Sequence, residues 1–161
     1  MTMTLVETIT VGSGGAASIE FTGIPQTGKD LLIVLSYRSS FSDTVRTLNI
    51  YPNGDTTGVS TILLEGLGSS VQSFSGGDSF GRVNGSTSTA NTFSSTTGYF
   101  SNYTSGSAKS FTVDAVTENN ATSANAGIVA GLWNKTSPIT SLKFDAATTL
   151  EHTTASLYII S

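Results

Sequence analysis

Residues 5–21 read LVETITVGSGGAASIEF, and this stretch decides the fold class. Apolar and polar side chains alternate on both sides of the glycine-rich segment 12–15, which is the period of a half-buried β-strand. Glycine tolerates the positive φ angles of a tight turn. The stretch therefore predicts two strands joined as a β-hairpin.

The same two-residue period recurs along the chain. Residues 111–115 read FTVDA, and similar alternating or short apolar segments lie at 31–35, 48–50, 142–144 and 155–159. The pattern predicts about nine to eleven strands and no helix, and hence an all-β fold, an antiparallel two-sheet β-sandwich. A jelly roll accommodates this number of strands better than a seven-stranded immunoglobulin domain. The side chains expected to face the core are Ile19, Phe21, Leu32, Val34, Leu48, Ile50, Phe111, Val113, Leu142, Phe144, Leu157 and Ile159.

The 161 residues suit a single domain. We expect an N-terminal arm at residues 1–4 and one β-sandwich domain at 5–161. Within it, residues 66–97 are rich in Ser, Gly and Thr, and we expect one or two short strands and a long excursion there.

The composition narrows the function classes. Charged residues make up 11% of the chain, against about 25% in average soluble domains, whereas 26 Thr and 25 Ser are present. The formal net charge of −4 and the lack of a basic tract argue against a nucleic-acid partner. The longest apolar run, 31–35, is too short to span a membrane, and the first residues do not have the pattern of a signal peptide. The absence of cysteine excludes disulfides and thiolate chemistry.

Candidate chemical sites are weak. Residues 77–81 (GDSFG) match the G-x-S-x-G esterase motif around Ser79, but His152 is the only histidine and no helix pattern follows the motif. The oxygen-rich segments 53–55 and 118–120 offer Ca²⁺ ligands, yet the same residues are normal in β-turns. We therefore expect no enzyme activity, no cofactor and no metal site.

Aromatic side chains and the chain ends offer two further candidates. A sugar-stacking platform could be built from Trp133, Tyr37, Tyr51, Tyr99 and Tyr103, although Trp133 ends an apolar run that is more typical of a core. The closing segment is apolar on both faces, and the two N-terminal methionines can adapt to irregular apolar surfaces. The expected interface residues are Met1, Thr2, Met3, Thr4, Tyr158 and Ile160.

Three segments carry a family resemblance: LVETITV with ASIEF and TGIPQT at 5–27, AGLWNKTSPITSL at 130–142, and ASLYII at 155–160. Together they resemble small β-sandwich, jelly-roll structural proteins of tailed bacteriophages, in particular head decoration (cement) proteins of the cyanophage type. The resemblance implies a virion protein on the outer surface of the capsid, a homotrimer, and the major capsid protein as partner. It brings no catalytic residues.

The leading expectation is therefore a capsid decoration protein that stabilises the head shell. The alternative is a receptor- or carbohydrate-binding module of a tail fibre or baseplate, with the aromatic residues and polar loops forming the site.

Overall fold

The computed structural model describes residues 1–118, 120 and 122–161 and contains strands but no helix within them. Strands occupy just over half of the chain. The described residues form twelve strands, slightly more than the nine to eleven that the alternating pattern predicts. They are β1 (Met3–Thr10), β2 (Ile19–Phe21), β3 (Asp30–Tyr37), β4 (Val45–Pro52), β5 (Val59–Leu67), β6 (Ser70–Gly76), β7 (Ser79–Asn84), β8 (Ser94–Phe100), β9 (Lys109–Glu118), β10 (Ala124–Trp133), β11 (Leu142–Asp145) and β12 (Thr154–Ile160).

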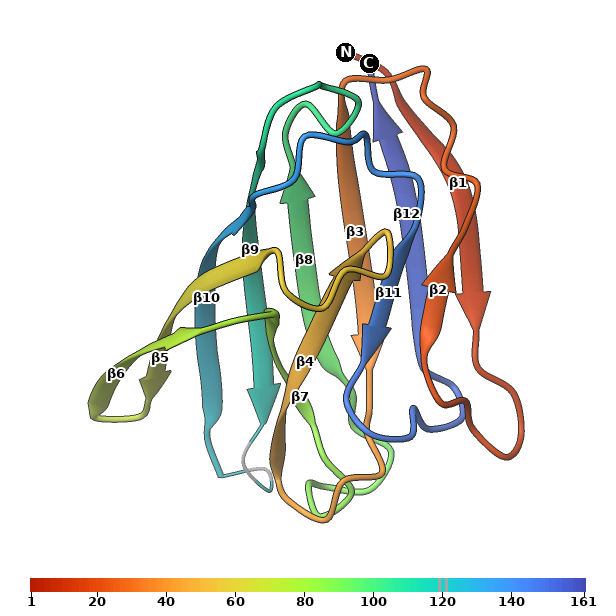
Figure 1. Cartoon of the computed structure of the whole chain (residues 1–161). Helices are drawn as coiled ribbons and strands as arrows, with labels where there is room; N and C mark the ends of the chain where they lie inside the picture. The colour runs from red at the N-terminus through yellow and green to blue at the C-terminus, as the bar shows by residue number, and fades with distance from the viewer. Residues whose placement is uncertain (119, 121) are drawn as a thin grey trace.

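The strands form two antiparallel sheets that pack face to face, which confirms the predicted β-sandwich (Figure 1). The larger sheet has the order β1-β12-β3-β8-β9-β10-β5-β6, and the smaller has the order β2-β11-β4-β7. The sets β1-β12-β3-β8 and β2-β11-β4-β7 form a jelly roll, because strands that follow one another in this eight-stranded set lie in opposite sheets, except for β4 and β7, which are neighbours in the smaller sheet. The hairpins β5–β6 and β9–β10 are additions that widen only the larger sheet.

The prediction that the two strands in residues 5–21 pair with each other as a hairpin is wrong. β1 pairs with β12, whereas β2 pairs with β11 in the other sheet. Gly14 and Gly15 do adopt positive φ angles of 92° and 75°, so the glycines form a turn as expected. That turn carries the chain across to the opposite sheet, and each strand then pairs with a partner from the far end of the sequence.

The core lies between the sheets and is rich in phenylalanine. Phe144 makes edge contacts with Phe80 and Phe21, at centroid distances of 5.0 and 6.5 Å, and Phe111 stacks on Phe100 at 4.5 Å. Ten of the twelve predicted core residues are buried. The other two, Leu32 and Val34, were predicted wrongly, because β3 turns Leu31, Ile33 and Leu35 inward.

The predicted excursion at 66–97 is mostly strand. It contains β6, β7 and the start of β8, so the irregular part shrinks to residues 85–93. Arg38 holds this loop: its guanidinium donates hydrogen bonds of 2.7 and 2.8 Å to the carbonyls of Thr89 and Thr92 and one of 3.0 Å to that of Ser88. These bonds tie three backbone carbonyl groups of the loop to one side chain.

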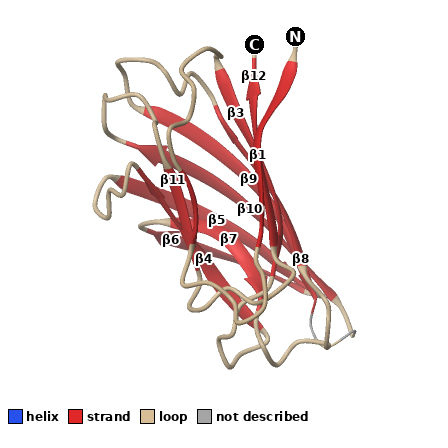
Figure 2. Ribbon diagram, turned by 90° about the vertical axis from the view of Figure 1, so that its right-hand side faces the viewer, coloured by secondary structure: helices blue, strands red, loops and turns tan. Residues whose placement is uncertain are grey.

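The N-terminal arm is shorter than predicted. β1 begins at Met3, and Thr2 exchanges backbone hydrogen bonds of 2.9 and 3.0 Å with Ser161. The two chain ends therefore lie side by side at one end of the larger sheet (Figures 1 and 2).

Candidate interaction surfaces

The esterase-like motif does not form a nucleophile turn. Ser79 opens strand β7 and is buried, and the chain continues as a strand instead of the helix that the motif requires. His152 lies in an exposed turn before β12, where its imidazole is 3.8 Å from the Glu151 carboxylate.

The polar side chains of the first Ca²⁺ candidate, residues 53–55, make hydrogen bonds within the fold. The Asp55 carboxylate accepts hydrogen bonds from the Thr57 amide at 3.0 Å and from the Trp133 indole at 2.9 Å, while Lys135 lies 3.9 Å away. These donors, the Thr57 amide first, lower the pKa of Asp55 to about 2. The Asn53 side-chain oxygen likewise accepts the amides of residues 140 and 141.

The second candidate, at 118–120, falls partly on residue 119, which lies outside the described residues. Within them, the Glu118 carboxylate accepts hydrogen bonds from the amide of Thr89 at 2.7 Å and from the hydroxyl of Thr92 at 3.0 Å. No cluster of three or more potential metal-ligating side chains occurs among the residues that the structure describes.

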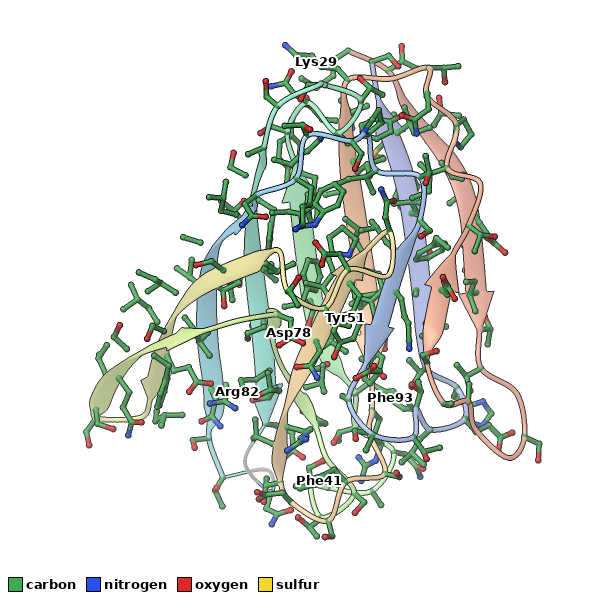
Figure 3. All side chains as sticks on the ribbon, in the orientation of Figure 1. Lys29, Phe41, Tyr51, Asp78, Arg82 and Phe93 are labelled. Atoms are coloured by element: carbon green, nitrogen blue, oxygen red, sulfur yellow. The ribbon has the colours of Figure 1, made fainter. Side chains whose placement is uncertain are left out.

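The predicted aromatic platform does not assemble. Trp133, Tyr37 and Tyr103 are buried in the core. Tyr51 and Tyr99 are half-buried but lie on opposite sheets, Tyr51 on β4 and Tyr99 on β8. Tyr99 donates a 2.6 Å hydrogen bond to Asp30. Burial and a hydrogen bond to Asp78 raise the pKa of Tyr51 to about 12 (Figure 3).

A groove that the sequence did not reveal lies between the β5–β6 hairpin and the β4–β7 edge of the smaller sheet. Two adjoining hollows of about 220 and 320 Å³ form it, and both are lined by Phe74 and Arg82. We call it the Phe74 groove. Thr61, Leu63 and Asp78 line the smaller hollow, and Glu65, Gln72, Asn125 and Asp43 line the larger one.

Two of the charged side chains in the Phe74 groove, Arg82 and Glu65, form an ion pair. Arg82 Nε lies 2.7 Å from Glu65 Oε1, and its Nη1 donates a 2.6 Å hydrogen bond to the Thr47 hydroxyl. The guanidinium also lies 5.5 Å from the centre of the Phe74 ring. Glu65 is buried, whereas the Phe74 ring is 40% exposed, so the groove offers an aromatic ring beside amide and carboxylate groups. This chemistry suits a polyhydroxylated ligand.

Of the predicted interface residues, Met3, Tyr158 and Ile160 lie together on one face of the larger sheet. Met3 pairs with Ile160 and Leu5 pairs with Tyr158, so these four side chains share its outer face at the β1 edge. Met3 and Leu5 are 58% and 51% exposed. We call Met1, Met3, Leu5, Tyr158 and Ile160 the terminal patch. Thr4, in contrast, pairs with Ile159 and belongs to the opposite face.

No helix long and apolar enough to cross a membrane is present in the described part of the chain. In comparisons with known proteins, no family model, no curated protein and no solved structure matches this chain.

Proposed function

We propose that this protein is a structural component of a phage virion, a decoration protein that binds the outer surface of the capsid and stabilises it. It would do so as a homotrimer, with the major capsid protein as its partner. Binding that occurs only on the assembled shell stabilises that shell by mass action. The family resemblance of the three quoted segments is the starting point, and viral capsid proteins are among the users of the jelly roll.

The observation that carries the proposal is the terminal patch. Its side chains are uncharged, mostly apolar and strongly exposed at Met1, Met3 and Leu5, and they come from both ends of the chain. Monomeric proteins seldom leave adjoining apolar side chains exposed without a partner. A sister subunit or the capsid surface would cover this patch.

The test uses side-chain substitutions, because deleting residues 1–4 would also remove backbone pairs of β1 with β12. We expect Met3→Ser combined with Leu5→Ser to lower the occupancy on expanded phage capsids at least tenfold and to dissociate the trimer. Val34→Ser is the matched control, because Val34 is 41% exposed on the same face but lies on β3. Melting temperatures of all variants show whether the fold is kept. The proposal would be contradicted if the parent protein were a monomer and if parent and double variant bound capsids with equal occupancy.

The Phe74 groove favours a second candidate, a carbohydrate- or receptor-binding module. The exposed Phe74 ring, the Asp78 carboxylate and the amides of Gln72 and Asn125 provide the stacking surface and hydrogen-bonding groups that such a site needs. A glycan array tests it: sugar binding that Phe74→Ala abolishes and Val71→Ala leaves intact supports this function. Val71 is the control because it pairs with Gly66, so its side chain lies on the outer face of the larger sheet and away from the groove.

A further inference from the structure

The outer face of the larger sheet carries a second group of exposed aliphatic side chains, far from the chain ends. Strands β5, β6, β9 and β10 form the half of the sheet opposite to β1 and β12 (Figure 1). The exposed side chains there are Ile62 (55%), Leu64 (51%), Val71 (79%), Val116 (42%), Ile128 (61%) and Leu132 (44%). We call these six residues the aliphatic patch.

Strand register makes the patch continuous. Ile128 is directly opposite Leu64, and Ile62 is opposite Ala130. Val116 is opposite Ala126 on the neighbouring strand pair. Directly opposite side chains in a sheet lie about 4.5–5.5 Å apart, so no polar row separates these residues.

The patch is almost free of charge. Asp114, opposite Ile128 on β9, is the one charged side chain on the outer face among these rows of the described strands. The free edge strand β6 contains neither charge nor proline, and its pairing with β5 shows no bulge. Soluble proteins usually protect an edge strand with one of these features. A solvent-facing antiparallel sheet is normally polar outside, so this half of the face has the chemistry of a covered surface.

We propose that a second copy of this chain covers the aliphatic patch, with the two larger sheets packed outer face to outer face. The area supports this occupant. Four strands about 4.8 Å apart and about seven residues long, at 3.4 Å per residue, give a footprint of roughly 450 Å² per copy. The pair then covers about 900 Å² in total, near the lower limit of ~1,000 Å² for a specific interface.

The position of Asp114 favours one arrangement of the two copies. A two-fold axis parallel to the strands, between β5 and β10, places β9 of one copy over β6 of the other. Asp114 then faces Ser73 of the second copy, because Asp114, Ile128, Leu64 and Ser73 occupy one row across these strands. An axis perpendicular to the strands would bring the two Asp114 carboxylates together, which like-charge repulsion disfavours. The patch is thus complementary to itself.

Sedimentation of the isolated protein over a concentration series tests the pairing without any capsid. We expect Ile62→Glu combined with Ile128→Glu to raise the dissociation constant at least tenfold. Val34→Glu, on the same face but on β3, should leave it unchanged. Circular dichroism melting confirms that each variant is folded. A parent protein whose mass matches that of the double variant at every concentration up to the high micromolar range overturns the proposal.

A cross-linking experiment checks the geometry and uses the absence of native cysteine. Asp114→Cys and Ser73→Cys proteins are mixed and treated with a bis-maleimide that spans the ~10 Å between facing sheets. We expect the mixed product to exceed either self-linked product. Absence of the mixed product, or a dominant product between two Asp114→Cys chains, overturns the arrangement.

This inference is independent of the proposed function. A mass that falls with the terminal-patch variant but not with the aliphatic-patch variant would overturn the inference and support contact through the chain ends. Loss of capsid binding alone would leave the pairing of the aliphatic patches untouched.

Discussion

Replacing Asp55 by Asn should remove a charge-dependent part of the stability of the fold. Asp55 precedes β5 and accepts hydrogen bonds from the Thr57 hydroxyl and amide and from the indole of Trp133 on β10. Asn has nearly the same shape but carries no charge, and its amide nitrogen cannot accept a hydrogen bond from the indole. The single oxygen of Asn can replace only one of the two carboxylate oxygens, so either the buried Trp133 N–H or the Thr57 donors lose their acceptor.

The magnitude follows from the pKa of Asp55, which is lowered from 3.8 to about 2 in the folded protein. Each pH unit of such a shift corresponds to about 1.36 kcal/mol, so the ionised form contributes at most about 2 kcal/mol. The Asp55 side chain is 16% exposed, and partial solvation brings the expected value to about 1–2 kcal/mol. Because the folded pKa is depressed, this stability is present above the unfolded pKa of 3.8 and is lost as the pH falls towards 2.

Urea denaturation followed by the fluorescence of Trp133, the only tryptophan, measures this contribution directly. We expect the Asp55→Asn protein to be less stable at neutral pH by about 1–2 kcal/mol and the difference to close as the pH approaches 2. A difference that stays constant from neutral pH down to about pH 2 would refute the reasoning, because the loss would then not depend on the carboxylate charge.

Three further substitutions test the core and the groove. Phe144→Ala removes a fully buried ring and should cost about 3–5 kcal/mol in chemical denaturation; a cost below about 1 kcal/mol would contradict the assigned packing. Gly98→Ala places a Cβ 2.0 Å from the buried Phe80 ring and should cost about 1–3 kcal/mol, whereas Gly106→Ala, with nothing within 4 Å, is the control that should cost little. Glu65→Gln leaves the Arg82 guanidinium without its carboxylate partner and should lower the free energy of unfolding by about 1–3 kcal/mol. High salt should not lower the stability of the parent protein by the same amount, because the Glu65 carboxylate is buried.

Local periodicity predicted the strands well, because alternation reports directly on which side chains a sheet can bury. It could not predict the partners of those strands. The residues at 5–21 look like a hairpin, yet β1 and β2 pair with β12 and β11, which lie more than a hundred residues away. The five consecutive apolar residues at 31–35 do not indicate which alternate side chains face the core. Leu32 and Val34 are therefore predicted in the core, although they face outward.

The Phe74 groove had no sequence signal for a similar reason. Phe74 lies in a Ser/Gly-rich stretch without periodicity, and Arg82 and Glu65 are 17 positions apart. Only the pairing of β5 with β6, and the position of β7 beneath them, brings these side chains together. The terminal patch is predictable in part, because Met1, Met3, Tyr158 and Ile160 are uncharged and lie at the two chain ends, whereas Leu5 joins them only through its pairing with Tyr158.

The two added hairpins explain why candidate surfaces occur at β5 and β6. A jelly roll needs four strands in each sheet, but β5–β6 and β9–β10 double the larger sheet while the smaller stays at four strands. The smaller sheet covers the inner face only as far as β7, which packs against β8, β9 and β10 and touches β5. Beyond that point, the inner face of the hairpin forms the wall of the Phe74 groove, and its outer face carries part of the aliphatic patch. A ligand in the groove and a second copy on the patch would therefore contact opposite faces of the same two strands, and neither would have to displace the other.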